Sequence, residues 1–172
     1  IFDINLFGMV RGLRTFVPLL KRQGSGQVVN VASLAGLVHP AGMGSYNAVK
    51  AAVVALTETA GHELAAHGIS AHAVCPGFFR TNLMDSLRGA DAALGQVMSS
   101  LVEDSPVSAQ DVAAAVLAGL DAGDELILPD ESARAALHLK RADRASYDAV
   151  MRAQARSLDK LAGEAADAGG EQ

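Results

Sequence analysis

A tyrosine and a lysine four positions apart, Tyr46 and Lys50, are the residues of this sequence best suited to chemistry. On an α-helix, residues at this spacing share a face and lie about 6 Å apart along the axis. A nearby ammonium favours the ionised form of a phenol, which suits the phenol to general acid–base catalysis. The same spacing occurs by chance on ordinary helices, so the pair needs support from other residues.

Ser33, thirteen positions before Tyr46, gives that support. It follows a β-branched run over residues 27–32, which predicts a short strand buried on both faces. Ligands bind at the carboxyl ends of parallel strands in open α/β sheets. A serine placed there can donate a hydrogen bond to a substrate oxygen as it gains negative charge. The alternative interpretation is a serine that caps a turn.

Helical and strand patterns alternate along the rest of the chain. Because parallel strands need long crossover connections, this alternation predicts an α/β fold in which helices cover a parallel sheet. Ser108 and Asp111 resemble a capping box at the start of one helix. The predicted helices cover residues 2–22, 45–67, 108–122 and 131–162, the predicted strands cover residues 27–32, 70–75 and 125–128, and residues 78–106 are predicted to be irregular or weakly helical.

The order of these features resembles the short-chain dehydrogenase/reductase family, in which a strand, a serine, a loop and Tyr-x-x-x-Lys follow one another. Residues 3–8 (Asp-Ile-Asn-Leu-Phe-Gly) resemble the family's helix that bears a functional asparagine. Residues 27–33 resemble the strand that delivers the serine, and residues 75–81 resemble the Pro-Gly segment beside the nicotinamide. The resemblance implies a partial doubly wound parallel sheet, Rossmann-like, with helices on both faces.

The same resemblance implies an oxidoreductase that transfers a hydride between NAD or NADP and a secondary alcohol or ketone. Tyr46 would exchange a proton with the substrate oxygen, and Lys50 would assist it and bind the nicotinamide ribose. Ser33 would orient and polarise that oxygen. Asn5 would hold a water that passes protons toward Lys50. The alternative for Asn5 is a solvated residue near a frayed helix end.

Cofactor contacts are also implied at the Pro-Gly segment. Gly77 would let the chain pass close to the nicotinamide ring, whereas the blander interpretation of Pro76-Gly77 is a turn. Residues 82–105, including Leu83, Met84 and Leu87, align with the family's substrate lid or are simple core packing. The implied cofactor-binding residues are Tyr46, Lys50, Pro76, Gly77, Phe79 and Thr81.

Composition excludes several other classes of function. The net charge is −5 at pH 7 and no basic stripe is present, which argues against nucleic-acid binding. No apolar run is long enough to span a membrane. The single cysteine, Cys75, is interpreted as a buried small residue in a reducing, cytoplasmic setting. The histidines lack metal-ligand spacing, so no metal is predicted, and His39 is interpreted as a satisfied or exposed loop residue.

The first residues already follow a helical pattern and lack an initiating Met, which indicates an upstream part. The family's Gly-rich phosphate-binding turn has no counterpart in this sequence. We therefore expect residues 1–172 to be the C-terminal part of one NAD(P)-binding domain, with residues 1–128 as catalytic core and 129–172 as a helical extension. Because the strand at 27–32 would leave an edge unpaired, we expect this segment alone to be poorly stable and inactive.

The apolar surface of the helix at 45–67 exceeds what one side of a sheet covers. Together with the family's usual contact, this predicts a homodimer or homotetramer through helices 2–22 and 45–67. Two other functions stay open: a catalytically idle cofactor-binding or scaffold protein, and epimerase-type chemistry. The presence of Asn5, Ser33, Tyr46 and Lys50 together favours the oxidoreductase.

Overall fold

A parallel three-stranded sheet forms the centre of the protein, which the computed structural model describes over residues 1–82 and 92–169. The strands are β1 (Gly26–Val31), β2 (Ile69–Val74) and β3 (Leu126–Ile127), in the spatial order β1-β2-β3. Both pairs are parallel. The predicted parallel sheet is therefore confirmed, with each strand bound shifted by one residue.

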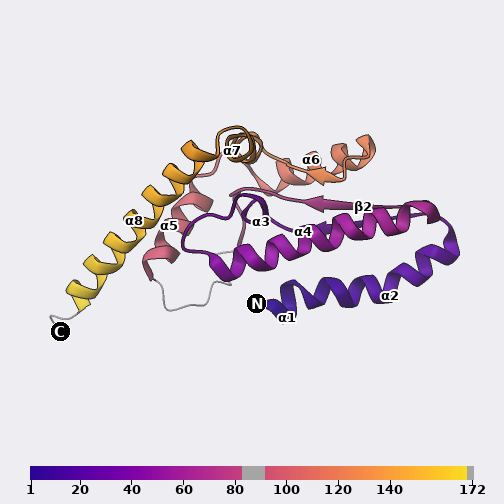
Figure 1. Ribbon diagram of the computed structural model, residues 1–172, viewed down its shortest axis with the longest axis horizontal. Helices are drawn as coiled ribbons and strands as arrows, with labels where there is room; N and C mark the ends of the chain where they lie inside the picture. The colour runs from indigo at the N-terminus through magenta and orange to yellow at the C-terminus, as the bar shows by residue number, and fades with distance from the viewer. Residues whose placement is uncertain (83–91, 170–172) are drawn as a thin grey trace.

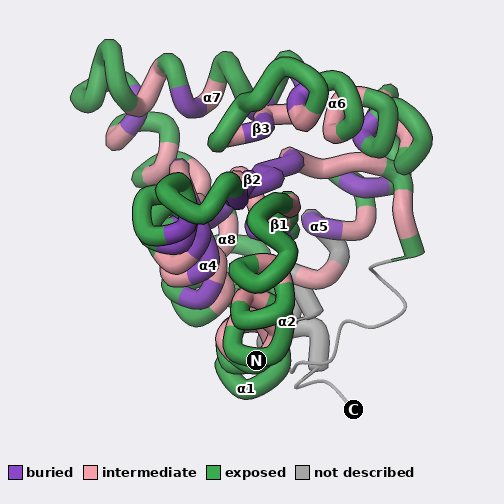
Figure 2. The backbone as a smooth tube through the Cα atoms, turned by 90° about the vertical axis from the view of Figure 1, so that its right-hand side faces the viewer, coloured by how far each residue is buried: buried purple, intermediate pink, exposed green. Residues whose placement is uncertain are grey.

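Helices cover both faces of this sheet, as predicted. Figures 1 and 2 show α2 and α4 on one face and α6 and α7 on the other. Helix α3 follows β1 and packs against α4, and α5 contacts α8, which projects away from the sheet (Figure 1). The helices are α1 (Phe2–Asn5), α2 (Phe7–Gln23), α3 (Ala35–Val38), α4 (Gly44–Leu64), α5 (Ala92–Glu103), α6 (Ala109–Ala122), α7 (Glu131–Ala142) and α8 (Arg144–Gly169).

Burial differs sharply between the two long strands. In β2 nearly every residue is buried, because strands lie on both sides of it and helices cover both faces. In β1 the side chains alternate, and Val29 and Val31 remain 39% and 54% exposed. Over residues 1–82 and 92–169, no strand pairs with the outer edge of β1.

Two of the predicted helices are interrupted. The helix expected over residues 2–22 breaks at Leu6, whose φ and ψ are −109° and −60°. The helix expected over residues 131–162 breaks at Asp143, where φ is −138°. The Asp143 carboxylate accepts the Ser146 N–H at 3.0 Å, so it starts a new helix instead of continuing the old one.

Residues 78–106 were predicted to be irregular or weakly helical, and within them the structure has a regular helix of twelve residues, α5. Leu83, Met84 and Leu87, which were assigned to a lid or to core packing, lie outside the described residues. The capping box of α6 is confirmed, since Ser108 and Asp111 bond each other's backbone N–H groups. Among the helices that are described, none has the length and apolar character needed to cross a membrane.

Candidate active site

Lys50 lies at the centre of the predicted site. It extends from α4 so that Nζ lies 5.8 Å from the centroid of the Tyr46 ring and donates a hydrogen bond to the Val31 carbonyl at 3.1 Å. The side chain is half-buried, and this burial lowers the pKa of Lys50. The structure therefore brings the predicted phenol and ammonium together on one helix face, at the end of β1.

Ser33 lies just beyond the last residue of β1. Parallel hydrogen bonds between the two segments continue beyond the ends of β1 and β2, on either side of Ser33. The Ala32 N–H donates to Val74 O at 2.8 Å, and the Leu34 N–H donates to Pro76 O at 2.9 Å. Ser33 Oγ accepts the Ala35 N–H at 3.1 Å, so the serine also caps a turn, as the alternative interpretation held. That bond fixes the oxygen without using the hydroxyl proton.

Gly36, which the sequence analysis did not identify, brings the loop between Ser33 and Tyr46 (the serine loop) against α4. A Cβ at this position would lie 2.5 Å from the carbonyl carbon of Lys50 and 2.6 Å from its oxygen. Only a residue without a side chain permits this approach of two backbones. The loop that follows Ser33 therefore crosses α4 at the turn that carries Tyr46 and Lys50.

Cys75, the residue after β2, is fully buried and lies close to Ser33 and Lys50. Burial raises the pKa of its thiol to about 11, although a Ser33 backbone hydrogen bond and the nearby Lys50 charge act in the opposite direction. A thiol in this environment stays neutral and unreactive. The prediction that Cys75 is a buried small residue is confirmed.

Two other parts of the chain hold Pro76 and Gly77 of the Pro-Gly segment by hydrogen bonds. The Pro76 carbonyl accepts the Leu34 N–H, and the Gly77 N–H donates to Asp130 Oδ2 at 2.9 Å. Farther along, Phe79 and Thr81 are half-buried, and Thr81 shares a pocket with Val102 of α5. The structure thus places Pro76 beside the Ser33 loop, whereas Thr81 lies toward α5.

Asn5 is the last residue of α1 and is half-buried. Helix α1 packs against α4, so the asparagine lies on the neighbour of the helix that bears Tyr46 and Lys50. Its backbone N–H donates to Ile1 O at 2.9 Å.

A pocket of about 330 Å³ opens between the serine loop, the Pro-Gly segment and α5. Its size falls at the lower end of the range for small-molecule sites. The lining is mainly apolar, with hydroxyl groups from three serines and the carboxylate of Asp104. Residues that line it include Leu34, Gly77, Phe78, Leu101, Ser105 and Ser132.

His39, in the loop between Ser33 and Tyr46, has hydrogen-bonding partners for both ring nitrogens. Nε2 lies 3.1 Å from Gly36 O, and Nδ1 lies 2.8 Å from Lys140 Nζ. The interpretation as a satisfied loop histidine is confirmed. Its partner Lys140, on α7, was not identified from the sequence.

A family model described as short chain dehydrogenase matches residues 1–92 of the 172-residue chain. The chain belongs to the short-chain dehydrogenase family. The matched residues hold most of the site described above, from Asn5 to Thr81.

Relatives of this short-chain dehydrogenase family member include enzymes with different substrates. The 3-oxoacyl-[acyl-carrier-protein] reductase of Synechocystis sp. is 36% identical over 87 residues, which cover 51% of this chain and 35% of the relative. The 2-(R)-hydroxypropyl-CoM dehydrogenase of Xanthobacter autotrophicus is 35% identical over 124 residues, which cover 71% and 50%. The chain therefore spans about a third to a half of the length of these curated relatives.

Solved structures of short-chain dehydrogenases confirm the fold. The enzyme from Burkholderia phymatum in complex with NAD superimposes with a TM-score of 0.75 at 30% identity, covering 83% of this chain and 57% of that chain. The enzyme from Burkholderia cenocepacia in complex with NADP gives 0.72 at 28% identity, covering 87% and 58%.

Proposed function

We propose that this member of the short-chain dehydrogenase family transfers a hydride between NAD or NADP and a secondary alcohol or ketone. The observation that carries the proposal is the half-buried Lys50 ammonium beside the Tyr46 ring, at the end of the strand that leads to Ser33. Within the proposal, residues 1–128 carry the chemistry and residues 129–172 form an extension. We keep the expectation of a cytoplasmic setting, which depends on the single Cys75.

The residues present fit a nicotinamide cofactor. Lys50 has three N–H donors, and Val31 O is its acceptor among the described residues, which leaves donors for ribose hydroxyls. When bound, the nicotinamide supplies or accepts the hydride. The residues proposed to hold the cofactor are Tyr46, Lys50, Pro76, Gly77, Phe79 and Thr81.

The proton is handled by the chain's own residues. Tyr46 gives a proton to the substrate oxygen in reduction and takes it back in oxidation. The half-buried Lys50 ammonium, 5.8 Å from the centroid of the Tyr46 ring, would stabilise negative charge that develops on the reacting oxygens. Ser33 donates a hydrogen bond to the same oxygen. Asn5 holds a water that relays protons toward Lys50.

Tyr46→Phe in the full-length protein tests this function. Turnover, followed by nicotinamide absorbance with a panel of ketones and secondary alcohols, should fall by about 10²–10⁴-fold because the proton donor is removed. Cofactor binding, measured by calorimetry, should persist because the ring and Lys50 remain. Unchanged behaviour of the variant would instead support the idle scaffold, and thermal melting checks that the variant is folded.

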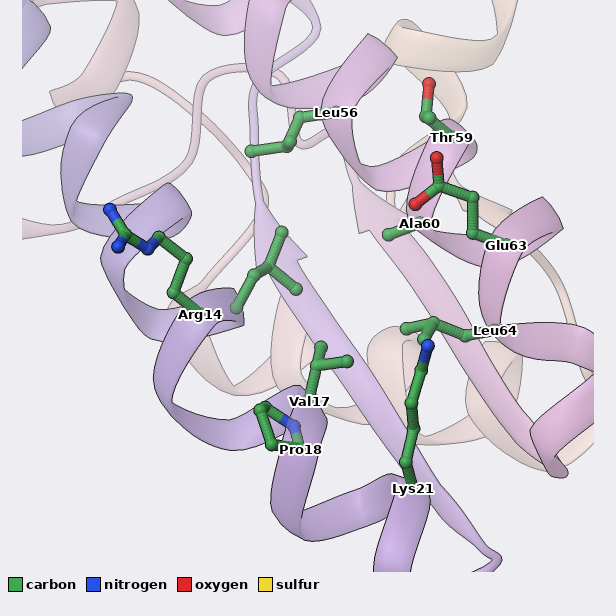
Figure 3. Close-up of a pocket in the computed structure, with 10 residues that line it drawn as sticks. Arg14, Val17, Pro18, Lys21, Leu56, Thr59, Ala60, Glu63 and Leu64 are labelled. Atoms are coloured by element: carbon green, nitrogen blue, oxygen red, sulfur yellow. The ribbon is translucent and has the colours of Figure 1, made fainter.

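The proposal includes a homodimer or homotetramer through helices 2–22 and 45–67. Between α2 and α4 runs a groove of about 290 Å³, lined by Val17, Leu56 and Ala60 and flanked by Arg14 and Glu63 (Figure 3). The apolar lining of this groove, between the two helices proposed to form the contact, supports the proposal.

Leu56, which lines this groove from α4, offers a test of this interface. Leu56→Glu should give a smaller species by light scattering, whereas Leu117→Glu, on 63% exposed Leu117 of α6, should not. An unmodified protein that is monomeric would remove the proposal.

A further inference from the structure

Asp130 connects the start of α7 to the Pro-Gly segment. Its side chain is buried, with 5% exposure, and a buried carboxylate is stable only when donors surround it. Oδ1 accepts the Ala133 N–H at 2.7 Å and the Ser132 hydroxyl at 2.6 Å, while Oδ2 accepts the Gly77 N–H at 2.9 Å. One carboxylate thus caps a helix and holds a loop of the site at the same time.

The contact between Gly77 and Asp130 is also sterically tight. A Cβ on Gly77 would lie 3.2 Å from Oδ1 and 3.3 Å from Oδ2. The absence of a side chain therefore lets the backbone N–H of Gly77 reach the carboxylate. Both residues are needed for this geometry.

Lys140, near the other end of α7, connects the helix to the serine loop. Its Nζ donates hydrogen bonds to Leu37 O and to His39 Nδ1, both in the loop between Ser33 and Tyr46. From the start of α8, the Tyr147 hydroxyl donates to Val38 O in the same loop.

An apolar cluster joins the same elements. Val38 of the loop, Leu137 of α7 and Tyr147 of α8 are buried together, at 7%, 6% and 4% exposure. Leu34 and Leu37 pack against them, and α7 contacts α3 directly. The hydrogen bonds of Lys140 and Tyr147 therefore occur at a packed contact, not between mobile surface groups.

We propose that α7 is a positioning element of the site, in which Asp130 holds the Pro76-Gly77 segment and Lys140 holds the loop that follows Ser33. Ten residues of helix separate the two anchors by about 15 Å, so one rigid element sets the spacing of both loops. The family model's match ends at residue 92, so this role belongs to the part of the chain beyond it. The inference rests on the proposed function for its kinetic consequences.

The two anchors act on different parts of the reaction. Asp130 positions the segment proposed to face the nicotinamide, so its loss should raise the KM for the cofactor more than it lowers kcat. Lys140 positions the loop that carries Ser33, so its loss should lower kcat while the KM for the cofactor changes little. Neither residue is proposed to touch a reacting atom.

Asp130→Asn in the full-length protein isolates the contact with Gly77. Asparagine caps helices as well as aspartate does, but its single carbonyl oxygen cannot serve both Gly77 and the α7 cap. Hydrogen exchange of the amides in residues 76–82 should accelerate about tenfold, because a charge-assisted hydrogen bond is lost. The cofactor KM should rise by a similar factor.

Asp143→Asn is the matched control for this variant. Asp143 caps α8 through the Ser146 N–H and hydroxyl, as Asp130 caps α7, but it is exposed and lies away from the Pro-Gly segment. Exchange in residues 76–82 and the cofactor KM should both stay at the parent values. Equal effects of the two variants would overturn the proposal, because helix capping alone would then explain them.

Lys140→Met tests the other anchor and carries the test by itself if Asp130→Asn does not fold. Exchange in residues 36–41 should accelerate and kcat should fall severalfold, with Lys140→Arg restoring part of both. Arg141→Met, at the exposed next position of α7, is the control and should match the parent.

Hydrogen exchange and enzyme kinetics together distinguish the positioning role of α7 from the proposed function. Faster exchange at both loops supports the positioning role even if the parent shows no turnover, an outcome that would remove only the proposed function. Parent-like exchange in Asp130→Asn and Lys140→Met, with an active parent, would overturn the positioning role and leave the function intact.

Discussion

The residues proposed to face the ligands and those that hold their loops differ in burial and in hydrogen bonding. Ser33, Tyr46 and Lys50 are half-buried, and each retains polar atoms for a ligand. Asp130 and Tyr147 are 5% and 4% exposed and use their polar atoms on the protein itself. The reacting groups must stay available, whereas the supporting groups are most effective when fully bonded. Substitutions in the two sets should therefore differ in kind.

The largest effect is expected at Lys50, where one substitution should lower activity without lowering stability. Lys50→Met should lower kcat/KM by about 10²–10³-fold, since the charge proposed to assist proton transfer by Tyr46 is removed. The free energy of unfolding should stay constant or rise, because a partly desolvated ammonium is replaced by an apolar side chain of similar length. Enzyme assays and urea denaturation measure the two quantities. A clear loss of stability with normal turnover would place Lys50 among the supports.

Gly36 tests the close contact between the loop that follows Ser33 and helix α4, which carries Tyr46 and Lys50. Gly36→Ala should lower the free energy of unfolding by about 1–3 kcal/mol, because the new methyl group would overlap the Lys50 backbone. Gly12→Ala is the control: no atom lies within 4 Å of its Cβ position, so the α2 helix should gain about 0.5–1 kcal/mol. Urea denaturation of both variants gives the comparison. Equal stability of the two would show that α3 moves away from α4 without penalty.

Local patterns explain which parts of the site were predictable. Tyr46 and Lys50 lie one helical turn apart, and the capping box of Ser108 and Asp111 spans three positions, so short-range chemistry reveals both. Ser33 was predictable because strand ends and ligand sites coincide in parallel sheets. The parallel sheet followed from the alternation of helices and strands.

Tertiary contacts explain what was missed. The bond from Gly77 to Asp130 spans 53 positions, and that from Lys140 to Leu37 spans 103, so no periodicity records them. Asp130 could have been recognised from the sequence as a helix cap, but not as a partner of Gly77. The break at Leu6 interrupts a continuous apolar pattern, so the pattern does not reveal it.

A smaller effect is expected at Tyr147. Tyr147→Phe keeps the buried ring but removes the hydrogen bond to Val38 O, and should lower the free energy of unfolding by about 0.5–1.5 kcal/mol. Tyr46→Phe changes the only other tyrosine and should leave stability near the parent value, because its ring is half-buried at the proposed ligand site. Thermal and urea denaturation of the pair would measure this contrast. A larger loss in Tyr46→Phe would reverse it.

The smallest effect concerns pH and the contact of His39 with α7. Burial, and next the Lys140 charge, lower the pKa of His39 from its ordinary value of 6.5. The neutral ring accepts from Lys140 at Nδ1, so Nε2 carries the hydrogen and donates to Gly36 O. In the unfolded chain His39 takes up a proton near pH 6.5, whereas the folded protein resists it. The stabilising contribution is therefore complete above that pH and declines as the pH falls toward the lowered pKa.

Melting between pH 7.5 and 5.5 tests this contribution. The loss of stability from His39 should stay below about 1 kcal/mol, because the ring is exposed and solvent screens the charges. His39→Gln should flatten the decline, since glutamine cannot take up the proton. His62→Gln, at an exposed position in the last turn of α4, should keep the parent slope. If His39→Gln declines as steeply as the parent, groups elsewhere cause the acid sensitivity, and the Lys140–His39 contact does not depend on the charge state of the ring.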